Sequence, residues 1–113
     1  MARTLTCAAL NALIADRADV AVLDVRRRPA FEAAPQLIPG AVRKEPEEVA
    51  TWADALNRNQ PVVVYCVHGH EVSKGVVDRL RALGFEAALL EGGIEAWKAS
   101  GGPVTYWSGG TTP

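Results

Sequence analysis

A buried strand, a cysteine and a helix follow one another directly in the middle of the chain. Residues 61–65 include three valines and a tyrosine, which is the composition of a strand buried on both faces of a sheet. Downstream, the apolar side chains recur with the spacing of one helical stripe, at Val72, Val76, Val77, Leu80 and Leu83. Gly84 follows at the position of a left-handed helix cap. The pattern predicts that Cys66 lies between the carboxyl end of a strand and the amino end of a helix, where α/β sheets bind ligands.

The residues that follow Cys66 favour a negatively charged sulfur at this position. The first turn of a helix leaves backbone N–H groups without partners, and the helix dipole adds partial positive charge there. A turn that contains Gly69 can aim several N–H groups at one point and so form an anion-binding nest. We therefore expect Cys66 to be a reactive cysteine whose thiolate is stabilised by these amides. The alternative is a small, buried side chain that simply ends the strand.

Strand and helix patterns alternate along the rest of the chain. Aliphatic composition predicts further strands at residues 20–25, 41–43 and 86–90. Helix starts are predicted after Thr6, at Pro29, at Pro46 and after Gly92. The helix from Pro46 is expected to bury a stripe formed by Val49, Trp52, Ala53 and Leu56. This alternation predicts an α/β fold, in which a parallel sheet carries helices on both faces.

Composition sets the broad class of the protein. With 113 residues, 49% of them hydrophobic and 22% charged, the chain is expected to form one globular domain over residues 1–113. Its core should span about residues 4–100, and the tail at 101–113, rich in glycine, serine, threonine and proline, should be loose, unless Tyr106 and Trp107 pack back onto the body. A net charge of −1 provides no footprint for nucleic acid or an anionic membrane, and no apolar run could span a bilayer. Cys7 and Cys66 make no disulfide framework, so we expect a reduced, cytoplasmic protein.

Short motifs in the chain identify a family resemblance. A Y-C-x-x-G-x-x-x-S motif at residues 65–73 is followed by E-G-G-I-x-x-W at residues 91–97. Upstream lie L-D-V-R at residues 23–26 and I-P-G-A-V at residues 38–42. Over about residues 4–100, these motifs and their order resemble the single-domain rhodanese sulfurtransferases. The resemblance implies a five-stranded sheet, a persulfide intermediate on the cysteine, and transfer of sulfur from a donor to a nucleophilic acceptor.

The resemblance also implies which residues form the site. Cys66 would be catalytic, and Asp24 and Arg26 would support the loop through structural hydrogen bonds. The substrate-binding loop would consist of Val67, His68, Gly69, His70, Glu71 and Val72. The implied partners are a small sulfur donor and an acceptor, either cyanide, a thiol or the cysteine of an acceptor protein. Neither a cofactor nor a metal is expected.

The identity of the donor depends on charges around the loop. Members of the family that use thiosulfate often carry basic residues at two positions. One lies two places after the cysteine, and the other is an arginine just before the aromatic residue that follows the aspartate motif. Here these positions hold His68 and Ala30. Glu71 adds a negative charge near the mouth, which Lys74 or protonated histidines could offset. The run of arginines at residues 26–28 is either an anion-binding patch or a solvated turn. Thiosulfate remains the default donor.

Four other readings compete with sulfur transfer. The loops of related phosphatases and arsenate reductases are one residue longer than residues 66–71 and end in an arginine that binds the oxyanion. This chain has no arginine at the end of the loop. A zinc site built on Cys66, His68 and His70 would have three ligands on a turn whose side chains diverge. An acyl-transfer dyad of Cys66 with His68 lacks an orienting partner. The last alternative is a non-catalytic rhodanese-like module that binds other proteins.

Overall fold

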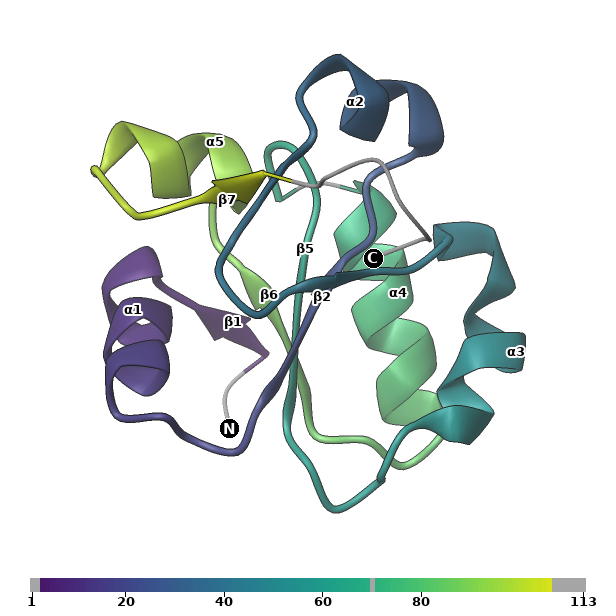
Figure 1. Ribbon diagram of the computed structural model, residues 1–113. Coiled ribbons are helices and arrows are strands. Elements are labelled where there is room, and N and C mark those ends of the chain that lie inside the picture. The colour runs from purple at the N-terminus through teal and green to yellow at the C-terminus, as the bar shows by residue number, and fades with distance from the viewer. Residues whose placement is uncertain (1–2, 70, 107–113) are drawn as a thin grey trace.

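The fold is built on a five-stranded sheet. The structure is a computed structural model, which describes residues 3–69 and 71–106. The strands lie in the order β1-β6-β5-β2-β4, and each neighbouring pair is parallel. Their bounds are Thr4–Leu5 for β1, Ala21–Asp24 for β2, Val42–Arg43 for β4, Val62–Tyr65 for β5 and Ala87–Leu90 for β6. The predicted α/β fold with a five-stranded, mainly parallel sheet is confirmed, and β5 is its central strand (Figure 1).

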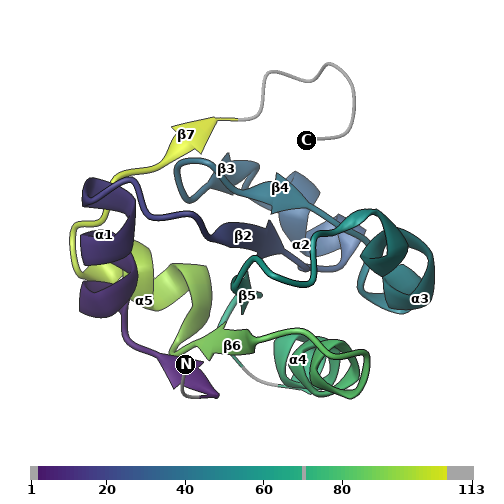
Figure 2. The same cartoon turned by 90° about the horizontal axis from the view of Figure 1, so that it is seen from below.

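Helices cover both faces of this sheet. Figure 2 shows α1 and α5 on one face and α3 and α4 on the other, while Figure 1 shows α2 near the end of β5. The bounds are Cys7–Ala15 for α1, Arg28–Ala33 for α2, Val49–Trp52 for α3, Glu71–Ala82 for α4 and Gly93–Ala99 for α5. Thr6 caps α1 by accepting a hydrogen bond from the backbone of Ala9, as its position predicts. Within the described residues, no helix is both long and apolar enough to cross a membrane.

The side chains of β5 alternate between two hydrophobic cores. Val62 and Val64 pack in the core shared with α3 and α4, which also contains Val49, Trp52, Val76, Val77 and Leu80. Val63 and Tyr65 pack in the core shared with α1 and α5, which also contains Leu10, Ile38, Ile94 and Trp97. All four residues of β5 are buried, so the predicted strand with two buried faces is confirmed. The end of β5 is therefore held rigidly from both sides.

The helix predicted from Pro46 is not continuous. Residues Pro46–Glu48 form a 3-10 turn (η1), α3 follows for four residues, and Ala53–Ala55 form a second 3-10 turn (η2). Valine, threonine and aspartate have only modest helix propensity, and the indole nitrogen of Trp52 donates a hydrogen bond at 2.8 Å to the carbonyl of Glu45, before the helix. The packing of the expected stripe is retained, because Val49, Trp52 and Ala53 are buried.

The prediction of a loose tail is wrong for its first residues. Thr105–Tyr106 form β7, which pairs antiparallel with β3, Gln36–Leu37. The indole nitrogen of Trp97 donates to the carbonyl of Pro103 at 2.7 Å, and a side chain at Gly102 would meet that indole ring at 2.5 Å. Residues 101–106 are thus fastened onto α5 and β3, while residues 107–113 lie outside the described part of the chain.

Candidate active site

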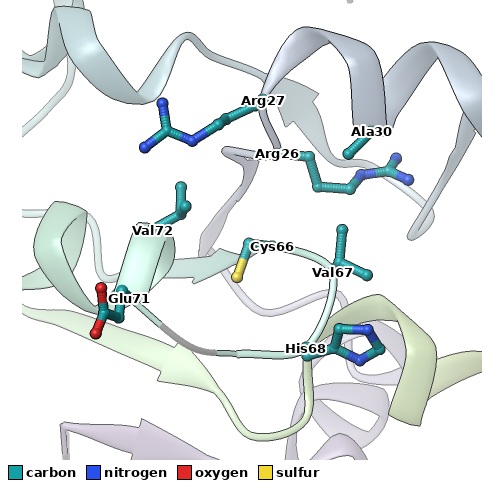
Figure 3. A pocket seen from close by; sticks show the side chains of 8 residues that line it. All are labelled: Arg26, Arg27, Ala30, Cys66, Val67, His68, Glu71 and Val72. Carbon is teal, nitrogen blue, oxygen red and sulfur yellow. The ribbon is translucent and has the colours of Figure 1, made fainter.

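Cys66 directly follows β5 and lines a pocket of about 380 Å³ (Figure 3). The turn after it leads into α4, which begins at Glu71. The pocket is lined by Arg26, Arg27, Ala30, Cys66, Val67, His68, Glu71 and Val72. The structure therefore gathers most of the predicted site residues around one cavity. His70 lies outside the described residues, and Lys74 is exposed and does not line the pocket.

The first turn of α5 binds the carbonyl groups of the loop. The backbone N–H of Ile94 donates to the carbonyl of Cys66 at 3.0 Å, and that of Glu95 donates to the carbonyl of Val67 at 3.1 Å. In a trans peptide group the N–H points opposite to the C=O, so the amides that follow these two carbonyls point away from α5. The contact leaves the N–H groups of Val67 and His68 on the side opposite α5, where they can face an anion.

Two glycines make this approach of α5 possible. A side chain at Gly93 would come within 2.4 Å of the Val67 carbonyl oxygen and 2.5 Å of the Cys66 carbonyl oxygen. Gly69, with a φ of +74°, presses against the turn between β6 and α5, because a side chain there would lie 2.9 Å from the nitrogen of Gly92. Gly69 thus lies on the side of the loop that contacts Gly92, and it does not line the pocket.

Ser73 places a hydroxyl group beside the sulfur of Cys66. Its hydroxyl oxygen lies 3.1 Å from the sulfur of Cys66, and either atom can be the donor. Ser73 is fully buried in the first turn of α4. Towards a thiolate the hydroxyl is the donor, so it would stabilise the ionised sulfur. The sequence motif contained Ser73 but gave no reason to assign it this position.

Asp24 and Arg26 form a buried ion pair beside the loop. One carboxylate oxygen of Asp24 accepts from the backbone N–H of Arg26 at 3.0 Å, and the other accepts from its guanidinium at 2.6 Å. The same guanidinium also donates to the carbonyls of Ala34 and Gln36, at 2.9 and 2.7 Å. These bonds join the end of β2 to the end of α2 and to β3, and α2 contributes Ala30 to the pocket lining.

Tyr65 fixes the residue before the cysteine. Burial, and then the negative charge of Asp24, raise the pKa of the Tyr65 phenol above its ordinary value, so it stays neutral. Its oxygen accepts a hydrogen bond from the backbone N–H of Ile38 at 3.2 Å. The start of the loop that begins at Cys66 is therefore tied to the segment after β3.

The arginine run at residues 26–28 is divided among different partners. Arg27 lines the pocket but forms an exposed ion pair with Glu47, and Arg28 pairs with Glu45 at 3.0 Å on another part of the surface. Arg43, which no sequence motif singled out, is buried and donates a hydrogen bond to the carbonyl of Arg26 at 2.9 Å. The guanidinium groups of Arg26 and Arg43 lie 5.1 and 5.3 Å from the ring centre of Phe31.

The second cysteine occupies a different environment. Cys7 is partly exposed at the start of α1, and its sulfur lies 3.8 Å from the carbonyl oxygen of Glu91. Burial, followed by the negative charge of Glu91, raises the pKa of the Cys7 thiol. Cys7 and Cys66 are not joined by a disulfide. In the part of the chain that is described, no group of three or more histidine, cysteine, aspartate or glutamate side chains could hold a metal ion.

Comparisons with known proteins agree with this architecture. The model of the rhodanese-like domain family matches residues 6–100. A Coxiella burnetii protein named thiosulfate sulfurtransferase GlpE is 33% identical over 82 residues, which cover 72% of this chain and 74% of that protein. A crystal structure of a rhodanese-related protein from Thermoplasma volcanium has a TM-score of 0.79 and 31% identity, with 92% of this chain and 98% of that chain covered.

A second similar structure carries a different suggestion of activity. It is a protein of unknown function from Rhodopseudomonas palustris, described as a possible tyrosine phosphatase. Its TM-score is 0.80 at 27% identity, with 91% of this chain and 84% of that chain covered. The match of the family model to residues 6–100 covers well over half of the sequence, and the fold agrees with it. The chain therefore belongs to the rhodanese-like domain family.

Proposed function

We propose that this chain is a sulfurtransferase that carries sulfane sulfur as a persulfide on Cys66. The observation that supports it best is the position of Cys66, in an open pocket between β5 and the start of α4, with the loop carbonyls bound by α5. A sulfur atom held there meets backbone N–H groups and the positive end of a helix. This environment suits an anionic nucleophile and an anionic product equally well.

The proposed reaction has two displacement steps. The Cys66 thiolate attacks the outer sulfur of a donor such as thiosulfate, the donor S–S bond breaks, and sulfite leaves with the bonding electron pair. The product is a Cys66 persulfide anion, so the total charge is unchanged. An acceptor nucleophile, either cyanide or a thiolate, then attacks the terminal sulfur, and the Cys66 thiolate is released. Both steps move only sulfur and electron pairs, so no cofactor is required, and ping-pong kinetics follow.

The family relationship supports this proposal over the alternatives. The Coxiella burnetii relative is named a thiosulfate sulfurtransferase. The possible phosphatase activity suggested for the Rhodopseudomonas palustris protein is less suited to this chain, because no arginine occurs between Cys66 and Arg79 to clamp a phosphate dianion. A reducing compartment such as the cytoplasm would keep the Cys66 thiol available for the reaction.

Thiocyanate formation tests the complete reaction. The wild-type protein and a Cys7→Ser variant should convert cyanide and a sulfane-sulfur donor to thiocyanate, whereas Cys66→Ser should not. Cys7→Ser is the matched control, since it makes the same chemical change at the other cysteine. Hydrolysis of an aryl phosphate that depends on Cys66 would instead support the phosphatase. A folded protein that does neither would support a non-catalytic binding module.

A further inference from the structure

The pocket in front of Cys66 has apolar walls. Ala30, from α2, and Val67 and Val72, from the two ends of the loop, line it (Figure 3). None of these side chains can donate a hydrogen bond or supply a charge. Beyond the sulfur that is transferred to Cys66, the remainder of a donor molecule would lie against this apolar surface.

Each of the two arginines that line the pocket is paired with a carboxylate. The Arg26 guanidinium is 2% exposed and is occupied by Asp24 and two backbone carbonyls. Arg27 forms an ion pair with Glu47, and in Figure 3 its guanidinium extends away from the sulfur of Cys66. The ring of His68 also points away from that sulfur, and Glu71 contributes a carboxylate to the lining (Figure 3).

Thiosulfate fits such a pocket poorly because it carries two negative charges. Moving a dianion out of water is costly unless cations or hydrogen-bond donors replace its hydration. An organic donor in which a carbon group replaces one charged oxygen (a thiosulfonate), or an R–S group replaces the whole sulfonate (a persulfide), carries a single negative charge at most. Its apolar group would gain free energy by leaving water for the walls formed by Ala30, Val67 and Val72.

From this arrangement, and resting on the sulfurtransferase function proposed above, we propose that the preferred donor is an organic sulfane-sulfur carrier with an apolar group and at most one negative charge. Organic persulfides and thiosulfonates belong to this class. With a persulfide anion R–S–S⁻, the Cys66 thiolate forms a bond to the terminal sulfur, the donor S–S bond breaks, and R–S⁻ leaves with the electron pair. Two anions react and two anions result, and no oxidant or reductant is consumed.

Thiosulfate, methanethiosulfonate and benzenethiosulfonate form a matched series for the test, since each donates sulfur from an S–S bond to a sulfonyl centre. The kcat/KM for thiocyanate formation is measured with each donor at one pH and divided by the rate constant of its uncatalysed reaction with cyanide. This normalised value should rise from thiosulfate through methanethiosulfonate to benzenethiosulfonate, by roughly tenfold or more overall.

Variants separate the effect of charge from that of size. Ala30→Arg places a cation on the pocket wall and should raise kcat/KM for thiosulfate by about tenfold relative to Ala30→Gln, which adds a long neutral side chain. Benzenethiosulfonate should gain less. Glu71→Gln removes a negative charge from the mouth without added bulk and should shift the preference in the same direction, which keeps the test valid if Ala30→Arg does not fold.

The outcomes distinguish the donor inference from the proposed function. Equal or better normalised kcat/KM for thiosulfate, with thiocyanate still formed through Cys66, would overturn the donor inference and leave the sulfurtransferase intact. A preference for benzenethiosulfonate that folded Ala30→Arg and Glu71→Gln proteins leave unchanged would also contradict it. Absence of Cys66-dependent thiocyanate with all three donors would overturn the proposed function, and the inference with it.

Discussion

The sulfur of Cys66 lies 3.1 Å from the hydroxyl oxygen of Ser73, which is fully buried in the first turn of α4. The distance is short enough for a hydrogen bond to sulfur, and the hydroxyl is the donor whenever Cys66 is ionised. Helix α4 therefore contributes to the site through a side chain as well as through its N-terminal backbone.

Removal of this hydroxyl should slow the first step of the reaction. We expect Ser73→Ala to lower the rate of sulfur loading onto Cys66 by about tenfold, because a hydrogen bond to a charged group contributes about 1.5–3 kcal/mol. Quenching the reaction at successive times and measuring the intact mass of the protein would give the rate of sulfur loading. An unchanged loading rate in a variant with wild-type thermal stability would exclude Ser73 from the stabilisation of the thiolate.

Gly93 should accept no side chain. Gly93→Ala would place a methyl group 2.4 Å from the carbonyl oxygen of Val67, in a residue whose φ is +63°. We expect a loss of at least about 2 kcal/mol in the free energy of unfolding, together with loss of sulfur loading. Gly75→Ala is the control, since a side chain there has open space within α4 and should stabilise the protein by about 0.5–1 kcal/mol. Urea denaturation of the two variants tests both expectations, and equal stability would contradict the close contact with α5.

The ion pair of Asp24 with Arg26 should be among the most sensitive polar contacts of the fold. Asp24→Asn leaves the buried guanidinium without a charge partner, so we expect the free energy of unfolding to fall by about 3–5 kcal/mol. The exposed pair of Arg27 with Glu47 offers a matched comparison, and Glu47→Gln should cost less than about 1 kcal/mol. Chemical denaturation would show the contrast, and similar losses in both variants would refute it.

Glu45 should make stability depend on acid pH. The hydrogen bond from Arg43, followed by the charges of Arg43 and Arg28, holds the pKa of Glu45 below its ordinary value of 4.5, although partial burial opposes the change. A carboxyl group with a lowered folded-state pKa stabilises the protein above its unfolded-state pKa, and this contribution is lost as the pH falls through the folded-state value.

Denaturation curves between about pH 3 and pH 6 would reveal this contribution. The difference in stability between the wild type and Glu45→Gln should shrink as the pH falls, because protonation then abolishes the same interaction in the wild type. Glu32→Gln, an exposed position on α2, should track the wild type throughout. A constant gap between wild type and Glu45→Gln would show that the carboxylate of Glu45 has no special role.

The central part of the fold could be predicted because its signals are local. The valines of β5, the cysteine after it and the apolar stripe of α4 adjoin one another in the chain, so β5 and α4 follow from periodicity alone. The short strands β3 and β7 have two residues each and show no period. The glycine-rich composition of the tail predicted a loose segment. One of these glycines, Gly102, instead allows the chain to pack against the ring of Trp97, because a side chain there would collide with the ring.

The parts of the site that were missed depend on contacts distant in sequence. Ile94 and Glu95 bind the carbonyls of Cys66 and Val67 through backbone N–H groups, which no residue type signals. Arg43 lies on a two-residue strand without a period, and its contacts with the ring of Phe31 and the carbonyl of Arg26 are distant in sequence. Local patterns thus located Cys66 between β5 and α4, while only the tertiary structure revealed what holds its loop in place.

The most direct test of the account is the mass of the protein after incubation with a sulfane-sulfur donor and removal of excess reagent. The wild type and Cys7→Ser should each gain one sulfur atom, located on the peptide that contains Cys66 and removed by cyanide. Cys66→Ser should gain none. Addition of sulfur to Cys66→Ser, or no addition to the folded wild type with any donor of the series, would contradict a persulfide carried on Cys66.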